Sequence, residues 1–463
     1  MTPEQMLRLK PELARFLQRF DDCFSRKDTR AHLPTYIHGQ LSDLPDKSVE
    51  PIASKAGVAP RTLQEFLSQL RWDHDQMRDR LQAIVCDEHA GPHSLGIFDE
   101  TSFVKKGDKT PGVQRQYLGC VGKKENGIVT VHLGYATGDF HCLLDGELFL
   151  PESWSDDRQR CQEAGIPDSV VYRPKWRIAL ELYDRAKANG LGFDWLTFDE
   201  GYGGKPDLLR ELQTRQQRYV AEVPRNFTGW LKAPRVVNRP FHRHGKGRGR
   251  KIPRLAAGSR PAQRVDDLYK RRVFQEQPWQ RFRVKDGDKG PMVWEVKHAR
   301  FYAKNEDGLP GERLHLIVAR DVLHPQEVKY FVSNAPAETP VATLLLVAFS
   351  RWRVERCFED HKGEVGLDHY EGRRYVGLQR HLALSAVSYL FLVRMRQQFG
   401  GEKDGANGVP GTPGNSSADS VLVAGGTTLE EIAGANSSRD GKDAAEERHR
   451  TAVPQQADQA KAA

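Results

Sequence analysis

The order of strand-like and helix-like segments between residues 94 and 224 limits the fold more than any other feature of the chain. Three short segments with alternating or β-branched residues, bounded by Gly, Asn or Pro, predict antiparallel strands at 94–107, 128–138 and 142–151. The residues that follow predict a helix, a strand, a helix and a strand at 176–190, 193–204, 206–217 and 218–224. This order predicts an α/β fold in which helices flank a mixed sheet.

The preceding segment, residues 1–90, predicts a helical N-terminal domain. Residues 67–85 have helical apolar spacing without Gly or Pro, and residues 48–70 predict two helices with a turn at Gly57. Two helices joined by a short turn fit a DNA-binding helix-turn-helix, and a plain helical hairpin fits equally well.

The segments after residue 224 differ from one another in composition. Residues 225–340 predict a β-rich insertion, and the helical pattern returns at 341–398. Residues 399–463 are rich in Gly, Ser, Ala and Asp with few large apolar side chains, so we expect a disordered tail with at most a short helix near 428–433. The strand patterns of the insertion lie at 281–286, 292–304, 313–320 and 327–333.

The net charge of +8 is unevenly distributed along the chain. Residues 401–463 hold 6 Lys and Arg and 10 Asp and Glu, which leaves 64 against 52, or +12, in residues 1–400. A body this basic favours a polyanionic partner such as nucleic acid, although a basic soluble protein without such a partner has the same charge.

Cysteine spacing and hydropathy indicate the compartment. The six Cys residues are widely spaced without a C-x-x-C pair, which indicates a reducing compartment and argues against a disulfide framework or a zinc knuckle. The first residues have no apolar signal core, and the longest apolar runs, 341–349 and 382–393, are shorter than the about 18–20 residues that span a bilayer. We therefore expect a soluble, cytoplasmic protein with no membrane partner.

Two acidic residues follow apolar strand segments. Asp99 follows LGIF, and Asp199 follows WLTF. Open α/β sheets place their ligands at the C-terminal ends of strands. A single Asp at such a position more often starts a turn or caps a helix, but two of them in a basic protein favour a shared cation site.

The segment RWRVERCFEDHKGEVG, residues 351–366, predicts a helix that carries a third acid. At 100° per residue, Arg351, Glu355 and Lys362 fall within about 40° of one another, beside an apolar stripe. If the stripe packs on the sheet, Glu355 reaches toward the two strand-end acids, whereas Glu359 lies further out. An exposed Arg–Glu pair would explain this helix alone but not the strand-end acids.

Three carboxylates from separate elements suit hard divalent cations. We predict that Asp99, Asp199 and Glu355 are the catalytic residues and the ligands of two Mg²⁺ ions, for which Mn²⁺ would substitute. Two ions about 3.5–4 Å apart activate a water or hydroxyl and stabilise the leaving oxygen of a phosphoryl transfer. No nucleotide cofactor is expected, because GYGGK at 201–205 lacks the spacing of a phosphate-binding loop.

Several basic side chains are candidate DNA contacts. Arg351 and Lys362 would hold phosphates beside the acids, and Lys105 and Lys106, shortly after Asp99, would meet the cleaved strand. A glycine-rich basic loop can track a phosphate backbone, although a solvated insertion loop has the same composition. The DNA contacts predicted in this loop, within residues 240–254, are Arg243, Lys246, Arg248, Arg250 and Lys251.

Three motifs resemble those of the DDE transposases of bacterial insertion sequences, in particular the IS-four superfamily and its IS-seven-hundred-and-one group. IFDETSFVKKG with GVQRQYLG resembles the region of the first Asp, and TFDEGYG resembles that of the second. The family signature Tyr, two residues, Arg, three residues, Glu, six residues, Lys is matched by Arg351, Glu355 and Lys362, whereas Ala348 stands in place of the Tyr. The likeness covers about residues 5–398.

The resemblance implies a ribonuclease-H-like catalytic domain formed by residues 91–224 and completed by 341–398. It implies a transposase that binds double-stranded DNA at terminal inverted repeats, cleaves the ends, joins them to target DNA and acts as a homodimer in a bacterial cytoplasm. Two other interpretations stay open: a nuclease of the same fold that cuts without joining, and a catalytically silent DNA-binding remnant or regulator. Ala348 and the unusual tail favour the silent protein, and the three acids favour the enzyme.

Overall fold

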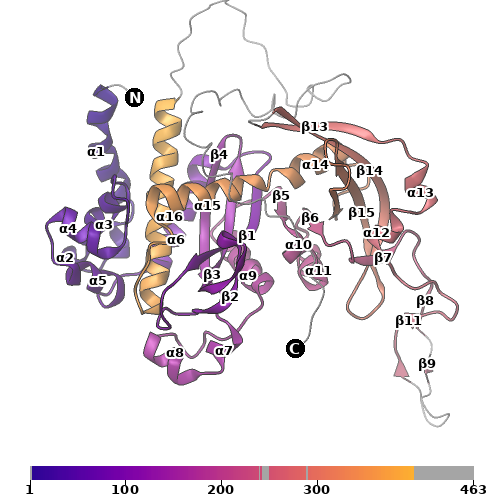
Figure 1. Ribbon diagram of the computed structural model, residues 1–463, viewed down its shortest axis with the longest axis horizontal. Coiled ribbons are helices and arrows are strands. Elements are labelled where there is room, and N and C mark those ends of the chain that lie inside the picture. Colours follow the sequence, from indigo (N-terminus) through magenta and orange to yellow (C-terminus); the bar gives the residue numbers. More distant parts are fainter. Residues whose placement is uncertain (1–2, 239, 242–249, 288–289, 401–463) are drawn as a thin grey trace, which may run out of the picture.

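The computed structural model describes residues 3–238, 240–241, 250–287 and 290–400, and its centre is one mixed sheet of twelve strands (Figure 1). The strand order is β12-β7-β14-β15-β16-β6-β5-β1-β3-β2, with β13 paired to β14 and β4 paired to β3. Strands β1, β5 and β6 are parallel neighbours, and the other pairs of this sheet are antiparallel. The predicted mixed sheet with flanking helices is therefore confirmed.

The strands fall into two groups along the chain. The first group is β1 (Leu95–Val104), β2 (Gln114–Leu118), β3 (Lys123–Thr137), β4 (Phe140–Leu148), β5 (Trp195–Phe198) and β6 (Tyr219–Val223). The second is β7 (Thr228–Trp230), β12 (Gln263–Arg264), β13 (Gln280–Gly287), β14 (Gly290–Lys304), β15 (Pro310–Asp321) and β16 (Val328–Ser333). Two small ribbons add β8 (Val236–Val237) with β11 (Arg254–Leu255), and β9 (Pro240–Phe241) with β10 (Arg250–Lys251).

The predicted insertion is continuous with the central sheet. Strand β16 pairs antiparallel with β6, with Val332 opposite Ala221, so the second group of strands extends the first. The four strand patterns predicted in this region correspond to β13, β14, β15 and β16. Sequence patterns cannot show which edge a strand joins, because that depends on hydrogen bonds between segments far apart in the chain.

Helices cover the sheet and form the N-terminal region. Residues before β1 form α1 (Pro3–Gln18), α2 (Lys27–Arg30), α3 (His32–Gln40), α4 (Val49–Ala56), α5 (Pro60–Ser68) and α6 (His74–His89). Between β4 and β13 lie α7 (Glu152–Ser155), α8 (Arg158–Ala164), α9 (Lys175–Ala188), α10 (Glu200–Gly203), α11 (Pro206–Thr214), α12 (Val265–Leu268) and α13 (Arg272–Gln275). The chain continues after β16 with α14 (Val341–Phe349), α15 (Trp352–Val365) and α16 (Tyr375–Gly400).

The prediction of a single helix at 67–85 is wrong, because two helices share this segment. Helix α5 ends at Ser68 and α6 begins after Asp73, whose side chain accepts a hydrogen bond from the Gln76 amide as an N-cap. The buried Arg380 donates to the main-chain oxygens of Phe66, Leu67 and Trp72, which satisfies the end of α5. The two helices predicted around Gly57 are confirmed, and Gly57 has a left-handed φ of 67°.

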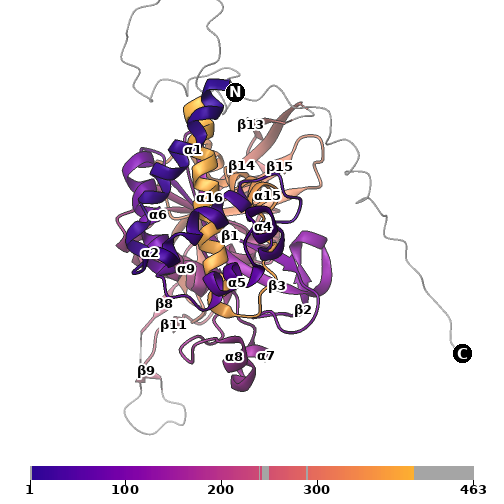
Figure 2. The ribbon, with the colours of Figure 1, turned by 90° about the vertical axis from the view of Figure 1, so that its left-hand side faces the viewer.

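Helix α16 contains the apolar run 382–393 and extends beyond it at both ends. Among the described residues, Tyr375–Phe399 is the one helix that would be long and apolar enough to cross a membrane by length and composition, but 72% of the window tested is buried inside the protein. Figure 1 and Figure 2 show α16 between the N-terminal helices and the sheet, and it contacts α5, α6 and β4. Its apolar residues therefore face protein on several sides.

Candidate active site

Asp99 and Asp199 stand next to each other at the point where two parallel strands stop pairing. The register between β1 and β5 ends with Phe98 opposite Phe198, and each Asp follows one of these residues. The two phenyl rings are stacked with centroids 5.7 Å apart, which fixes the strands beside the acids. Asp99 itself lies in the middle of β1, not at its C-terminal end as predicted, because β5 has only four residues and β1 continues along β3.

The carboxylate of Asp99 is almost fully withdrawn from solvent, with 8% of the residue exposed. Its Oδ2 accepts a hydrogen bond of 2.8 Å from Arg351 Nη1, and its Oδ1 accepts one from the Glu100 amide. Burial raises the pKa of Asp99 to about 7, with a further contribution from Asp199, while Arg351 acts in the opposite direction. A cation beside this carboxylate would favour its ionised form.

Asp199 is the N-cap of α10. Its Oδ1 accepts hydrogen bonds from the amides of Gly201 at 3.0 Å and Tyr202 at 3.3 Å, so the simple capping interpretation is correct for this residue. Neither bond uses Oδ2. The position of α10 depends on Gly203, where a Cβ atom would lie 1.9 Å from the main-chain oxygen of Glu222 on β6.

Helix α15 packs across β4, β3 and β1 and carries the third acid. Phe358 packs edge-on against His132, which stands opposite Asp99 in the β1–β3 register. The apolar stripe of α15 is buried as predicted, and Glu359 is exposed as predicted. The Glu355 side chain is 53% exposed, and its Oε1 accepts a hydrogen bond of 2.6 Å from Arg351 Nη2.

Arg351 joins the acids. One guanidinium nitrogen contacts Asp99 and another contacts Glu355, so a single cation bridges the strand acid and the helix acid. Burial alone would lower the pKa of Arg351, but Asp99, Glu355, Asp199 and Glu222 together raise it above its usual value. The four carboxylates are thus all within electrostatic range of one guanidinium.

Glu222 is the member of this group that sequence reasoning missed. The β5–β6 register ends with Phe198 opposite Ala221, so Glu222 follows its strand partner as Asp199 follows Phe198. Its carboxylate is ion-paired with Lys329 at 2.8 Å. The missed signal was the same as for the two Asp residues, an acid directly after an apolar run. A cavity of about 340 Å³ opens beside it, lined by Glu200, Glu222, Val223, Pro224, Arg225, Asn226, Val328, Lys329 and Tyr330.

The basic residues predicted as DNA contacts have different surroundings. Lys362 is half-buried, with Nζ 3.3 Å from the main-chain oxygen of Ser102, and Lys106 is exposed. Lys105 is not available as the predicted DNA contact. It is buried, and its ammonium donates to the main-chain oxygens of Asp368 and Tyr370 at 2.8 and 2.6 Å. Burial lowers the pKa of Lys105 to about 8.

The predicted basic loop falls mostly outside the described residues. Arg243, Lys246 and Arg248 lie outside them, as does the tail from residue 401. Arg250 and Lys251 form β10, but their side chains are also outside the described part of the chain.

Carboxylate oxygens are the donors that this site offers to a divalent cation. In the part of the chain that the structure describes, no three His, Cys, Asp or Glu side chains form a ready metal-binding group. The acids nevertheless fit a cation chemically, because Asp99 is buried beside Asp199, and Asp99 and Glu355 already share one positive partner. Coordination of a metal by both Asp99 and Glu355 would require Arg351 to release them.

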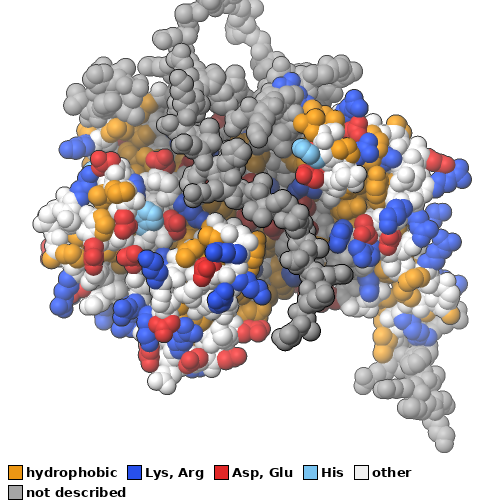
Figure 3. Space-filling model, in the orientation of Figure 1, with side chains coloured by type: hydrophobic (Ala, Val, Ile, Leu, Met, Phe, Trp, Pro, Cys, Tyr) orange, Lys and Arg blue, Asp and Glu red, His pale blue; other side chains and the backbone are white. Residues whose placement is uncertain are grey.

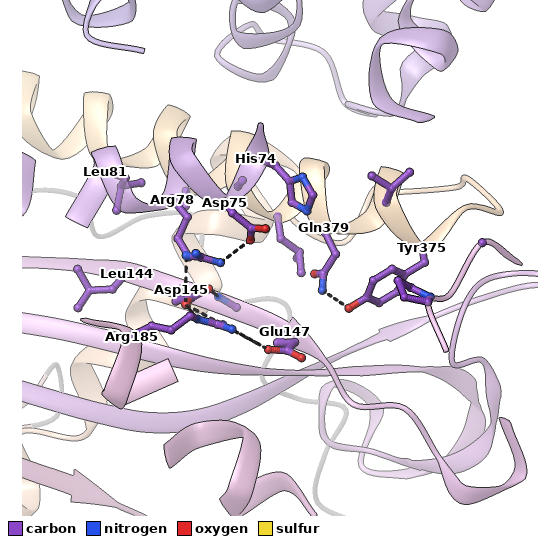
Figure 4. Close-up of a pocket in the computed structure, with 17 residues that line it drawn as sticks. His74, Asp75, Arg78, Leu81, Leu144, Asp145, Glu147, Arg185, Tyr375 and Gln379 are labelled. Atoms are coloured by element: carbon purple, nitrogen blue, oxygen red, sulfur yellow. Dashed lines mark hydrogen bonds and ion pairs between the residues drawn. The ribbon is translucent and has the colours of Figure 1, made fainter. Parts of the chain in front are cut away.

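A separate cavity lies away from these acids, between α6, α16 and β4 (Figure 4). It has a volume of about 320 Å³ and is bordered by a buried ionic network. Asp145 accepts hydrogen bonds from Arg185 and lies 3.7 Å from Arg78, while Glu147 pairs with Arg185 and Arg173. These charges neutralise one another and join the N-terminal helices to the sheet.

Comparison with known proteins identifies the family. The profile of the DDE superfamily endonucleases matches residues 19–291. The chain belongs to this family. The predicted resemblance to insertion-sequence DDE transposases is also confirmed by a curated relative, "Probable transposase for insertion sequence element IS701" of Microchaete diplosiphon, which is 33% identical over 210 residues. That alignment covers 42% of the chain and 52% of the relative, so the chain matches about half of the relative's length.

The family match includes two of the three candidate acids of this DDE superfamily endonuclease. Asp99 and Asp199 lie within residues 19–291, whereas Glu355 lies beyond them. Among solved structures, the NurA nuclease of Sulfolobus solfataricus is 10% identical, with a TM-score of 0.24 and coverage of 67% of this chain and 95% of the nuclease. This TM-score is too low to establish a shared fold.

Proposed function

We propose that the protein is a metal-dependent DNA transposase that cleaves the ends of an insertion sequence and joins them to target DNA. The observation that carries the proposal is the meeting of Asp99, Asp199 and Glu355 around Arg351. The two Asp residues come from adjacent parallel strands, and Glu355 is held to the same guanidinium from α15. Membership of the DDE superfamily endonucleases supports an enzyme that acts on DNA.

Asp99, Asp199 and Glu355 would hold Mg²⁺ ions, with Mn²⁺ as a substitute. When bound, the ions would supply activation of the attacking oxygen and stabilisation of the leaving oxygen in phosphoryl transfer. Arg351, Lys362 and Lys106 would bind phosphates near the acids, because a guanidinium or ammonium positions the backbone of the duplex. The burial of Asp99 excludes water from one side of the site.

The wider architecture is part of the same proposal. Residues 91–224 and 341–398 would form a ribonuclease-H-like catalytic unit, residues 1–90 would bind the terminal inverted repeats, and the strands of 225–340 would contact flanking DNA. Figure 3 shows Lys and Arg side chains gathered over β7, α12 and α13, where Lys270 and Arg272 are exposed, although several pair with neighbouring acids. A homodimer would hold two ends together.

The test is excision in cells of a marker flanked by the DNA ends that bracket the gene. We expect excision and reintegration with the unmodified chain and none with Glu355→Gln. Glu359→Gln is the matched control, since Glu359 lies one turn along α15 with its side chain 74% exposed. Activity that survives Glu355→Gln would refute the site assignment.

One observation favours a catalytically silent DNA-binding protein as the second candidate. Ala348, in place of the Tyr of the resembled signature, is buried on α14 and offers no hydroxyl to a DNA end. Sequence-specific binding to the ends without excision by the unmodified chain would support this candidate. Cleavage without reintegration would instead indicate a nuclease.

A further inference from the structure

Arg351 occupies the place of a cation between two acids of the proposed site. Its Nη1 is 2.8 Å from Asp99 Oδ2, and its Nη2 is 2.6 Å from Glu355 Oε1. The side chains of Arg351 and Asp99 are 22% and 12% exposed, so this half of the bridge is shielded from solvent, whereas the Glu355 side chain is 53% exposed. These are the same carboxylates that the proposed function assigns to a divalent cation.

We propose that Arg351 is a positioning residue that competes with the divalent cation for Asp99 and Glu355, and that a DNA phosphate ends this competition by binding the guanidinium. The inference rests on the proposed function, because it concerns the same acids. Loading of the cation would thus depend on DNA, and the acids would be neutralised by Arg351 whenever DNA is absent.

The geometry supports an exchange of partners. Each carboxylate receives one N–H bond from Arg351, one through Nη1 and one through Nη2, so neither contact is bidentate. A phosphate can accept two parallel bonds from the same guanidinium, which is a stronger arrangement. Arg351 precedes α15 as its N-cap residue, and its long side chain can turn without any movement of the helix.

Electrostatic repulsion means that Arg351 and the divalent cation would exclude each other from the two carboxylates. A guanidinium and a divalent cation between the same two carboxylates repel each other at short range, most strongly beside the buried Asp99. Asp199 also contributes negative charge at Arg351, and Glu222 does so while paired with Lys329. Asp99, Glu355 and Asp199 would therefore remain for a cation after Arg351 has left. Removal of the guanidinium should therefore strengthen cation binding, whereas removal of an ordinary structural ion pair would weaken the site.

The test measures Mn²⁺ binding to the whole chain by calorimetry, without DNA and with a short DNA duplex. The pH is about 8, above the ordinary pKa of Asp and Glu side chains. The variants are Arg351→Gln, Arg351→Lys, Arg356→Gln, Asp99→Asn and the double variant Asp99→Asn/Arg351→Gln. Arg356 is the matched control, because it lies on the same helix and pairs with Asp360 instead of the candidate acids. Thermal unfolding checks that each variant is folded, and Arg351→Lys, which keeps the charge with fewer donors, serves if Arg351→Gln does not fold.

We expect Arg351→Gln to bind Mn²⁺ at least about tenfold more tightly than the unmodified chain without DNA, with Arg351→Lys between the two. We also expect DNA to tighten Mn²⁺ binding by the unmodified chain and by Arg356→Gln but not by Arg351→Gln. Equal, Asp99-dependent Mn²⁺ affinities of the unmodified chain and Arg351→Gln would overturn the inference and leave the proposed function standing. Absence of Asp99-dependent binding in every variant, with and without DNA, would overturn both.

Discussion

The ammonium of Lys47 donates a hydrogen bond of 2.6 Å to the main-chain oxygen of Glu364, at the end of the helix that carries Glu355. Lys47 also donates to the main-chain oxygens of Gln40 and Ser42, and only 5% of the residue is exposed. This buried contact joins the N-terminal helical region to the candidate active site. The two regions are therefore connected through one lysine as well as through apolar packing.

Lys47→Met should destabilise the protein by about 2 kcal/mol or more, because three buried main-chain oxygens lose a charged donor. The free energy of unfolding from urea denaturation measures the effect. Lys55→Met is the matched control, since Lys55 forms an ion pair at the surface with Asp43, and its loss should change the stability little. Equal effects of the two substitutions would contradict the anchoring role of Lys47.

Asp99→Asn should reduce DNA strand cleavage by about 10³-fold while the protein stays folded. The folded-state pKa of Asp99 is about 7, above its unfolded value, so in metal-free buffer the ionised carboxylate lowers stability progressively as pH rises from about 4 to 7. The stability of Asp99→Asn relative to the unmodified chain should therefore increase with pH across this window. Urea midpoints in EDTA at several pH values measure this, and a pH-independent difference would contradict the raised pKa.

Acid should destabilise the fold through its buried histidines. Burial lowers the pKa of His132 and His361 to about 3 and that of His381 to about 4. The unfolded chain takes up these protons near pH 6.5 and the folded chain does not, so stability is lost as pH falls from about 6.5 toward 4. We expect a loss on the order of 1–2 kcal/mol per histidine at about pH 5.

His361→Phe is the substitution that tests the acid effect. The His361 ring packs against Tyr389 in a tilted arrangement with centroids 4.0 Å apart, and its Nε2 has no hydrogen-bond partner among the described residues. A phenyl ring keeps this ring contact and cannot take up a proton. The urea midpoint of the variant should depend less on pH between about 5 and 7 than that of the unmodified chain, and an unchanged slope would show that His361 does not contribute.

Gly203→Ala should misplace α10 and with it the Asp199 cap. The added Cβ would meet the main-chain oxygen of Glu222 at 1.9 Å, and backbone cannot move as a side-chain end can. We expect the free energy of unfolding to fall by about 2 kcal/mol and DNA cleavage to be lost. Gly192→Ala, at which an added Cβ meets nothing within 4 Å, should leave both close to normal. Urea denaturation and DNA cleavage measured for both variants test this, and equal results for Gly203→Ala and Gly192→Ala would contradict it.

Sequence patterns were sufficient wherever a property depends on neighbouring residues. Alternating apolar residues located β1, β3 and β4, and the apolar stripe of residues 351–366 identified the buried face of α15. Their position directly after apolar runs identified Asp99 and Asp199, which the register of β1 and β5 then brought side by side. Periodicity carries this information because each side chain's direction is set by its position in a strand or helix.

Tertiary structure alone decided the features that depend on distant segments. It extended the sheet through β16 beside β6, buried Lys105 against main-chain oxygens near residue 370, and added Glu222 to the acids around Arg351. It also divided the helix predicted at 67–85, where Arg380 of α16 supplies the hydrogen bonds that end α5. Local sequence cannot specify these contacts, since each partner lies more than a hundred residues away and is brought close only when the core packs.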